Sequence, residues 1–409
     1  MKSMIILFLA FLLAGAESGA VKNPYYKEIP NKKFELNKIT YIPLSGAMRN
    51  PNSAWGSIGT AREGFVYIMV CDHMSDAEVF EYNTKTDKLF TLGRITDHLG
   101  LKSWAERSPK IHSQVYQHAK SGLIYFGTDA GERSEGDLYD HQDEGYWGGF
   151  LCSLNPVTKE IKNLGLAGRH AGVKCLIVDS DNDVIYMNLS DGSRFTKYDI
   201  KTGKFTDLGR INGYEIPRTL FFDKWNNAYN CTESSELVRY NRTKDELEFL
   251  NVRLPGEPMG PSQIAYGPNR DYMYGIDNYS AIIFKYTPQA DGPGRIDSLF
   301  RLNDAKKGVG TRNLNFAGNK LYAVLTGMES DEAAGDSIRG ANLVVFDPEK
   351  RVVEKKVRMD DCISACYGHP NMDAQGNCYV AGFMDVQASK KYEGKKALVH
   401  LVKFNPKSL

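Results

Sequence analysis

The segment VIYMNLSDGSRFTKYDIKTGKFTDLG (residues 184–209) contains two strand-like runs and a turn, and its pattern recurs along the chain. The first run carries Tyr186, and the second ends in Tyr198, which is followed by Asp199 and a Lys-Thr-Gly turn. Asn, Asp, Pro, Thr and Gly after an aromatic residue are typical of hairpin turns. The segment therefore predicts antiparallel strands joined by tight turns.

A tyrosine-bearing strand of this kind occurs seven times, with the tyrosines 43 to 61 residues apart. The seven tyrosines are Tyr67, Tyr125, Tyr186, Tyr229, Tyr274, Tyr322 and Tyr379. Several strands per repeat at such a period predict an all-β fold, a β-propeller with seven blades. The last copy reaches Leu409 after its third strand, so we expect residues 38–45 to supply the missing strand and close the ring. Most of the tyrosines are expected to pack inside the blades.

The 409-residue chain has a formal net charge of +1, which argues against a general nucleic-acid partner. Residues 1–20 resemble a secretory signal peptide, with an apolar run followed by small residues at Ala16 and Ala20. We therefore expect residues 21–409 to form a single propeller domain that is exported, as a secreted or periplasmic monomer without a membrane anchor.

Three insertions interrupt the repeat, at residues 95–114, 129–150 and 326–342. The first two bring histidines, aromatic residues and charged residues close together in the sequence, and long loops on one face of a repeat fold often carry function. Aromatic rings beside such groups suit a sugar-binding groove. Solvated surface loops are the alternative. The candidate residues are His112, His141, Tyr146 and Trp147, together with His170 on the loop that follows the second copy.

The chain resembles a known enzyme family between about residues 60 and 230. The segments that carry the resemblance are KIHSQVYQ (110–117), GLIYFGTDAG (122–131), GGFLCSLNPVTKEIKNLG (148–165), DVIYMNLSDGSRFTKYDIKTGKFTDLG (183–209) and EIPRTLFFD (215–223). They look like the seven-bladed propeller polysaccharide lyases, in particular the ulvan lyases of polysaccharide lyase families 24 and 25.

The resemblance implies β-elimination at a uronic acid of a sulfated, anionic algal polysaccharide. A base removes the C5 proton, an acid protonates the leaving oxygen, and a cationic group binds the C6 carboxylate. By position, the resemblance implies catalytic roles for His112, Tyr186 and His141. It implies that Arg194 and Arg218 bind the carboxylate, and we expect His170, Tyr146 and Trp147 to line the groove.

The sequence also departs from the family. Asp129 and Phe150 stand where several relatives carry histidines. The departure leaves open a changed specificity, and a non-catalytic carbohydrate-binding or scaffolding propeller is the alternative function.

A cluster near the C-terminus raises the question of a metal. Cys362, Cys366, His369 and Cys378 could ligate a structural zinc through three thiolates and one imidazole, although the spacing is not a standard zinc pattern. The alternative is a set of thiols buried between the last two blades. The lyase chemistry requires no cofactor, so a metal here, zinc or calcium, would be structural.

Overall fold

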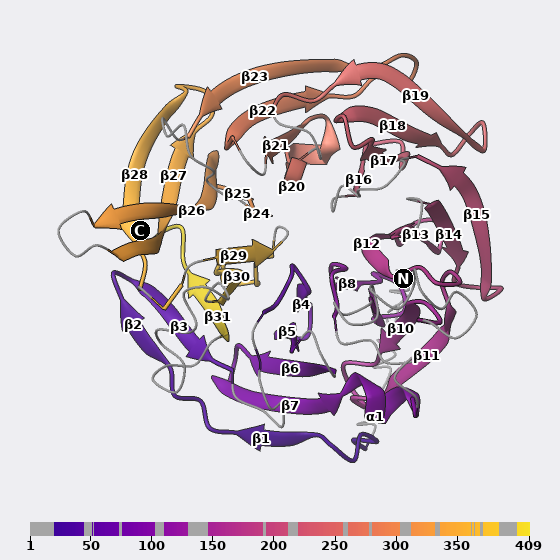
Figure 1. The fold of residues 1–409 in the computed structure, drawn as a ribbon, viewed down its shortest axis with the longest axis vertical. Helices are drawn as coiled ribbons and strands as arrows, with labels where there is room; N and C mark the ends of the chain where they lie inside the picture. Colours follow the sequence, from indigo (N-terminus) through magenta and orange to yellow (C-terminus); the bar gives the residue numbers. More distant parts are fainter. Residues whose placement is uncertain are drawn as a thin grey trace, which may run out of the picture.

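The computed structural model describes residues 20–44, 51, 53–72, 76–102, 110–129, 146–190, 194–211, 220–256, 261–277, 280–302, 312–331, 336–360, 362–363, 365–368, 371–383 and 399–409. The strands in these ranges form seven sheets arranged in a ring, as Figure 1 shows. The predicted seven-bladed β-propeller is confirmed. The expected signal peptide falls almost entirely on residues 1–19, which lie outside the described residues.

Blades 1 to 4 each contain four antiparallel strands in chain order. Blade 1 contains β4 (Ile58–Ala61), β5 (Phe65–Cys71), β6 (Ala77–Asn83) and β7 (Lys88–Arg94). Blade 2 contains β8 (Tyr116–Gln117), β9 (Ile124–Gly127), β10 (Phe150–Leu154) and β11 (Ile161–Leu166). Blade 3 contains β12 (Val173–Asp179), β13 (Val184–Leu189), β14 (Arg194–Asp199) and β15 (Lys204–Arg210). Blade 4 contains β16 (Phe221–Phe222), β17 (Ala228–Cys231), β18 (Glu236–Asn241) and β19 (Glu246–Arg253).

Blades 5 and 6 repeat this order, and blade 7 combines strands from both ends of the chain. Blade 5 contains β20 (Pro261–Tyr266), β21 (Met273–Asp277), β22 (Ile282–Thr287) and β23 (Arg295–Arg301). Blade 6 contains β25 (Asn315–Ala317), β26 (Lys320–Asp331), β27 (Asp336–Asp347) and β28 (Val352–Arg358). Blade 7 contains β29 (Ala365–Gly368), β30 (Cys378–Phe383), β31 (Val399–Phe404) and β3 (Ile39–Pro43).

The N-terminal segment closes the ring, as the sequence predicts. Strand β3 pairs antiparallel with β31, with Ile39 opposite Phe404. Two more strands from this segment lie outside the blades: β1 (Lys27–Ile29) pairs with β7, and β2 (Phe34–Leu36) pairs with β3. A short strand, β24 (Arg312–Asn313), adds to the inner edge of blade 7. The third predicted insertion lengthens the hairpin of β26 and β27.

The repeated tyrosines lie between the blades, where most are fully buried. In blades 4 and 7 the hydroxyl is satisfied in the same way: Tyr229 donates to Asp223 (2.9 Å) and Tyr379 donates to Asp373 (2.7 Å). A buried hydroxyl needs such a partner, because an unpaired polar group costs free energy in an apolar core. In these two blades the Asp therefore satisfies the buried Tyr hydroxyl.

The predicted hairpin turns follow one design. An Asn or Asp at the end of the third strand accepts a backbone N–H two or three residues further on, as in an Asx-turn. Six blades use this bond, through Asn83, Asn155, Asp199, Asn241, Asp347 and Asn405. These side chains fix the turn between the third and fourth strands and so specify the hairpins locally.

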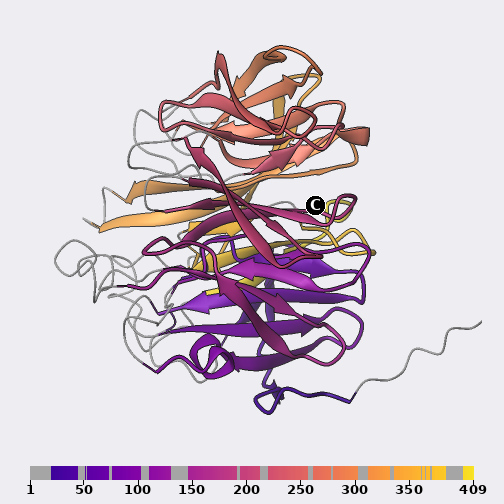
Figure 2. The ribbon, with the colours of Figure 1, turned by 90° about the vertical axis from the view of Figure 1, so that its right-hand side faces the viewer.

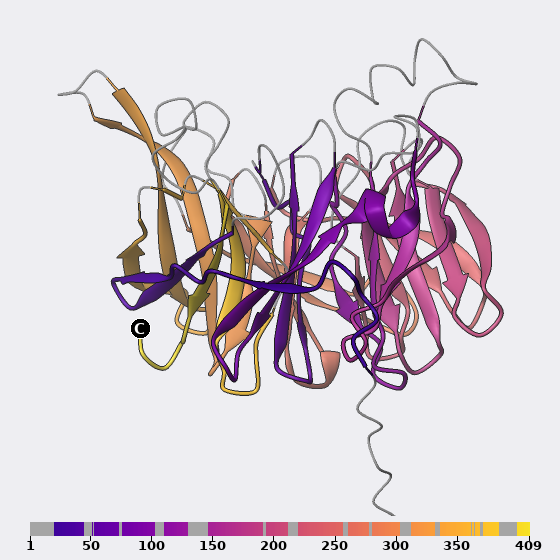
Figure 3. The same ribbon diagram turned by 90° about the horizontal axis from the view of Figure 1, so that it is seen from below.

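The antiparallel order gives the ring two distinct faces. One face carries the connections between blades and the connections between second and third strands, and we call it the upper face. The lower face carries the tight hairpins between first and second strands and between third and fourth strands. Figure 3 shows the ring from the side with these hairpins pointing downward, and Figure 2 shows the blades from another side. Helix α1 (Ile95–Leu99) lies at the upper end of blade 1. In the ranges described, no helix has the length and apolar character to cross a bilayer.

Candidate functional site

Three charged or titratable side chains meet at the upper ends of blades 2 and 3. Asp129 lies just beyond β9, and its carboxylate bonds with Nδ1 of His112, which precedes β8. The same carboxylate lies 2.8 Å from Nζ of Lys174, in the first strand of blade 3. The upper cluster, His112, Asp129 and Lys174, therefore joins two blades on the face that carries the first two insertions.

The carboxylate in this cluster is held in its charged form. Asp129 is fully buried, and burial would by itself raise its pKa, but Lys174 and His112 outweigh burial and lower the pKa of Asp129 below its usual range. An ionised carboxylate can only accept hydrogen bonds, so Nδ1 of His112 donates to Asp129. In a neutral imidazole this tautomer leaves the lone pair on Nε2, the arrangement of a general base.

The surroundings of the cluster restrict its geometry. A Cβ on Gly172 would lie 1.6 Å from Oδ1 of Asp129, so only glycine allows the backbone of blade 3 to approach this carboxylate. On another side, the Trp55 ring lies 5.8 Å from the His112 ring and packs on Tyr367 and Phe383 of blade 7. His112, 4% exposed, thus lies between the aromatic rings on one side and the charged groups of Asp129 and Lys174 on the other.

The connection between blades 2 and 3 brings together the predicted groove residues Tyr146, Trp147 and His170. Nδ1 of His170 donates to the backbone carbonyl of Tyr146 (2.7 Å), and its backbone N–H donates to the carbonyl of Trp147 (2.9 Å). Nε2 of His170 accepts from Nε of Arg169 (3.1 Å). Both ring nitrogens of His170 are therefore engaged. Trp147 is 49% exposed and available for contact, whereas Tyr146 is buried and cannot stack on a sugar as predicted.

Arg194 lies at the start of β14 and pairs with the carboxylate of Asp207. It lines an upper-face cleft of about 400 Å³ between blades 2 and 3, which Arg169 and Phe205 also line. The backbone of Ala167–Ala171 forms one side of this cleft and leads directly to Gly172 and Lys174 of the upper cluster. Arg169 therefore lies on the chain segment that leads to Lys174, and Arg194 lines the same cleft from β14.

The placement of Tyr186 corrects a sequence-based expectation. Tyr186 points into the core between blades 3 and 4, where its ring packs on Phe195, Phe222 and Tyr240. It is 1% exposed, and burial raises the pKa of its hydroxyl well above the usual range. The strand alternation that buries the other repeat tyrosines also buries this one, so Tyr186 does not line a cleft.

The predicted metal ligands do not form a metal-binding group within the described part of the chain. Cys362, Cys366 and Cys378 lie in one apolar cluster between blades 6 and 7, and burial raises the pKa of the Cys378 thiol to about 12. The structure corrects this prediction in favour of buried thiols. His369, His141 and Arg218 lie outside the described residues.

Sequence reasoning did not identify Asp129 and Lys174 as partners of His112. Asp129 was noted only as a departure from the related lyases, and Lys174 was not singled out. A signal was present, because Asp129 follows the strand directly at its upper end and Gly172 precedes Lys174 by two residues. The contact crosses from one blade to the next, however, and a single sequence does not show which strand ends face each other.

Comparisons with known proteins identify the fold alone. No protein-family model matches this chain, and no curated protein sequence matches it. Among solved structures, it is similar to a chain of the crystal structure of the mitotic checkpoint complex, with a TM-score of 0.55, 10% identity, and coverage of 98% of this chain and 99% of the other. It is also similar to the Cps50 (Swd1) β-propeller domain of Myceliophteria thermophila, with a TM-score of 0.53, 8% identity, and coverage of 88% and 99%.

Proposed function

We propose that this chain is an exported polysaccharide lyase that cleaves an anionic, uronic-acid-containing polysaccharide of the ulvan type by β-elimination. The observation that carries the proposal is the upper cluster, in which Asp129 orients the imidazole of His112 and Lys174 supplies a nearby cation. The resemblance of KIHSQVYQ and the neighbouring segments to the propeller lyases points to the same histidine.

The proposed chemistry assigns one reaction step to each group. Nε2 of His112 removes the C5 proton, the electron pair forms the C4–C5 double bond, and the C4–O bond breaks. The imidazolium then returns the proton to the leaving glycosidic oxygen. Because Tyr186 is buried and His141 lies outside the described residues, the proposal assigns both the base and the acid to His112. A cationic side chain must stabilise the charge that develops on the C6 carboxylate, and Lys174 and Arg194 are the candidates.

The burial of His112 sets a condition on this proposal. At 4% exposure, Nε2 reaches a sugar only if neighbouring side chains shift when the polymer binds. Catalytic contacts are often incomplete without substrate and form fully in the complex. The proposal therefore includes a rearrangement at the upper face on binding.

The test is to measure the ultraviolet absorbance of unsaturated uronates when the mature chain is mixed with a panel of uronate polysaccharides, ulvan included. We expect His112→Ala to reduce turnover by roughly 10²- to 10⁴-fold. The matched control is His118→Ala, because His118 pairs with Asp183 (3.0 Å) in a similarly buried cluster on the lower face. It should lower the melting temperature without lowering turnover.

Two outcomes would contradict the lyase proposal. Glycan binding without any rise in absorbance would indicate a non-catalytic carbohydrate-binding propeller. Equal losses of turnover in His112→Ala and His118→Ala, in proportion to their melting temperatures, would mean that both histidines only hold blades 2 and 3 together.

A further inference from the structure

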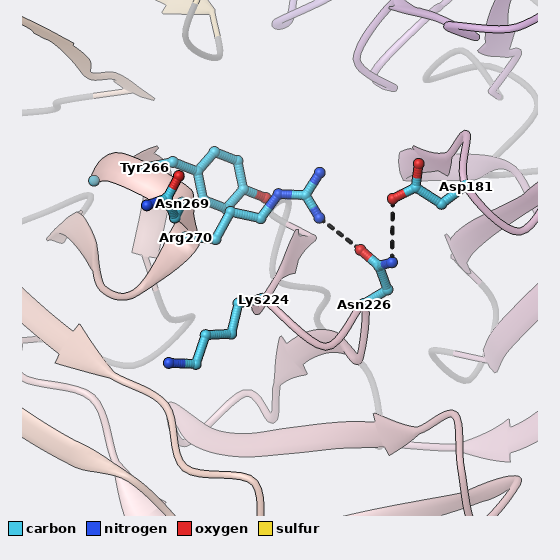
Figure 4. A pocket seen from close by; sticks show the side chains of 7 residues that line it. Asp181, Lys224, Asn226, Tyr266, Asn269 and Arg270 are labelled. Atoms are coloured by element: carbon cyan, nitrogen blue, oxygen red, sulfur yellow. Dashed lines mark hydrogen bonds between the residues drawn. The ribbon is translucent and has the colours of Figure 1, made fainter.

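The lower face carries a second pocket, far along the blades from the upper cluster. It has a volume of about 390 Å³, and its walls come from the tight hairpins of blades 3, 4 and 5. Figure 4 shows the side chains that line it. Those that matter here are Asp181, Lys224, Asn226, Tyr266, Asn269 and Arg270. The volume lies within the range of roughly 300–1,000 Å³ for small-molecule sites.

Arg270 is held in place from two directions. Its Nη1 donates to Oδ1 of Asn226 (2.7 Å), and its guanidinium lies over the rings of Phe222 (5.6 Å) and Tyr266 (5.8 Å). Its other N–H groups have no hydrogen-bond partner among the residues that the structure describes. A fixed guanidinium with unused donors can bind a ligand without losing much side-chain freedom.

The opposite wall offers an acceptor. Nδ2 of Asn226 donates to Oδ2 of Asp181 (3.3 Å), which leaves Oδ1 of Asp181 unbonded within the described part of the chain. These two bonds link the hairpins of blades 3, 4 and 5 in a row, as the dashed lines of Figure 4 show. The pocket is therefore preformed, with a donor at one side and a carboxylate at the other.

The charges of the pocket balance. Lys224 forms an ion pair with Asp271 (3.0 Å), so its positive charge is already compensated. Arg270 and Asp181 then remain as one cation and one anion on facing hairpins. A carboxylate ligand would gain from Arg270 but would be repelled by Asp181. The side-chain amide of Asn269 adds a group that can both donate and accept, with no partner among the described residues.

We infer that this lower pocket binds a neutral sugar residue. A sugar hydroxyl both donates and accepts, so adjacent hydroxyls can accept from Arg270 and donate to Asp181 at the same time. Trp225, next to Lys224 in the same hairpin, is 38% exposed, and Nζ of Lys224 lies 4.9 Å from the centre of its ring. The inference goes beyond the proposed lyase function and does not depend on it: it describes a second glycan site on the opposite face.

The test is saturation-transfer NMR and calorimetry on the full mature chain with cellobiose, maltose and lactose, and with glucuronate as the charged comparison. We expect saturable binding of at least one neutral disaccharide. Arg270→Ala and Asp181→Ala should each weaken that binding at least tenfold. The matched control is Arg62→Ala, because Arg62 lines a similar lower-face pocket of about 360 Å³ near blades 1 and 2. It should leave the binding unchanged.

Three results would overturn the inference: no neutral sugar binds at millimolar concentration, glucuronate alone binds, or binding persists in both Arg270→Ala and Asp181→Ala. The inference and the lyase proposal can fail separately. If His112→Ala lost lyase activity but still bound the neutral sugar, the lower-pocket inference would be supported. An active lyase without neutral-sugar binding would remove only this site.

Discussion

His112 and His118 lie at opposite ends of strand β8, and each imidazole pairs with an aspartate that also binds lysine. Both clusters join blade 2 to blade 3, His112 on the upper face and His118 on the lower face. The lower cluster accounts for the burial of His118, which is 2% exposed. Two such clusters at the ends of one strand allow a structural role to be separated from a chemical one by experiment.

Acid should weaken the upper cluster. Because the pKa of Asp129 is lowered in the folded state, its contribution to stability is fully present above the ordinary aspartate pKa of about 3.9 and is lost as pH falls toward the folded-state value. Asp129→Asn should therefore cost about 3–5 kcal/mol at pH 7, and less below pH 4. Thermal melting at both pH values measures this loss of stability.

Asp207→Asn, at a half-exposed ion pair, is the control and should cost under about 1 kcal/mol. If the difference in unfolding free energy between Asp129→Asn and the native chain were the same at both pH values, the prediction would be contradicted.

Removal of the hydroxyl group should destabilise the protein at Tyr229 but not at Tyr186. Tyr229→Phe removes the bond to buried Asp223 and should cost about 1–3 kcal/mol. Tyr186→Phe should change stability by under about 0.5 kcal/mol, because its hydroxyl makes no hydrogen bond to the described residues. It should also leave any lyase turnover unchanged. Urea unfolding and the absorbance assay measure both effects. A large loss of turnover in Tyr186→Phe would restore its predicted catalytic role.

The closing strand should be essential. A chain that begins at Val21 keeps β1, β2 and β3, whereas one that begins at Ser45 leaves the outer edge of β31 unpaired. An unpaired edge recruits other chains, so the shorter variant should melt earlier and aggregate. Light scattering and melting of the two variants test this. Equal, monomeric behaviour would mean that the ring is stable without β3.

A single added methyl group should disturb the upper cluster. Gly172→Ala would place a Cβ 1.6 Å from the Asp129 carboxylate, so the backbone or the carboxylate must move. Overpacking of this kind costs about 1–3 kcal/mol. We expect a lower melting temperature and, if the upper cluster is catalytic, a further loss of turnover. An unchanged melting temperature would show that the backbone of blade 3 can shift at Gly172 without loss of stability.

The blades could be predicted from the sequence because their signals are local. The tyrosine of each second strand, the Asn or Asp that ends the third strand in six blades and the turn that follows are all close together in the chain. The incomplete last copy was enough to predict that residues near Ile39 pair with it.

The candidate site could be predicted only in part, because its contacts cross between blades. His112 was singled out, but its partners Asp129 and Lys174 depend on how two blades pack. Tyr186 is buried, as the repeat pattern predicts for most of these tyrosines, and the catalytic role expected for it came only from the resemblance to the lyases. The lower pocket could not be predicted for the same reason, since Asp181 and Arg270 come from hairpins of different blades.

The pairing of β3 with β31 also sets an order of events during synthesis. Ile39 is made long before its partner Phe404. Contacts between residues so far apart in the chain form slowly, since a long loop must close first. The six blades that lie between them can form locally as the chain grows, but the seventh must wait. The ring can therefore close only after Phe404 has left the ribosome, because β3 cannot form this pairing before then.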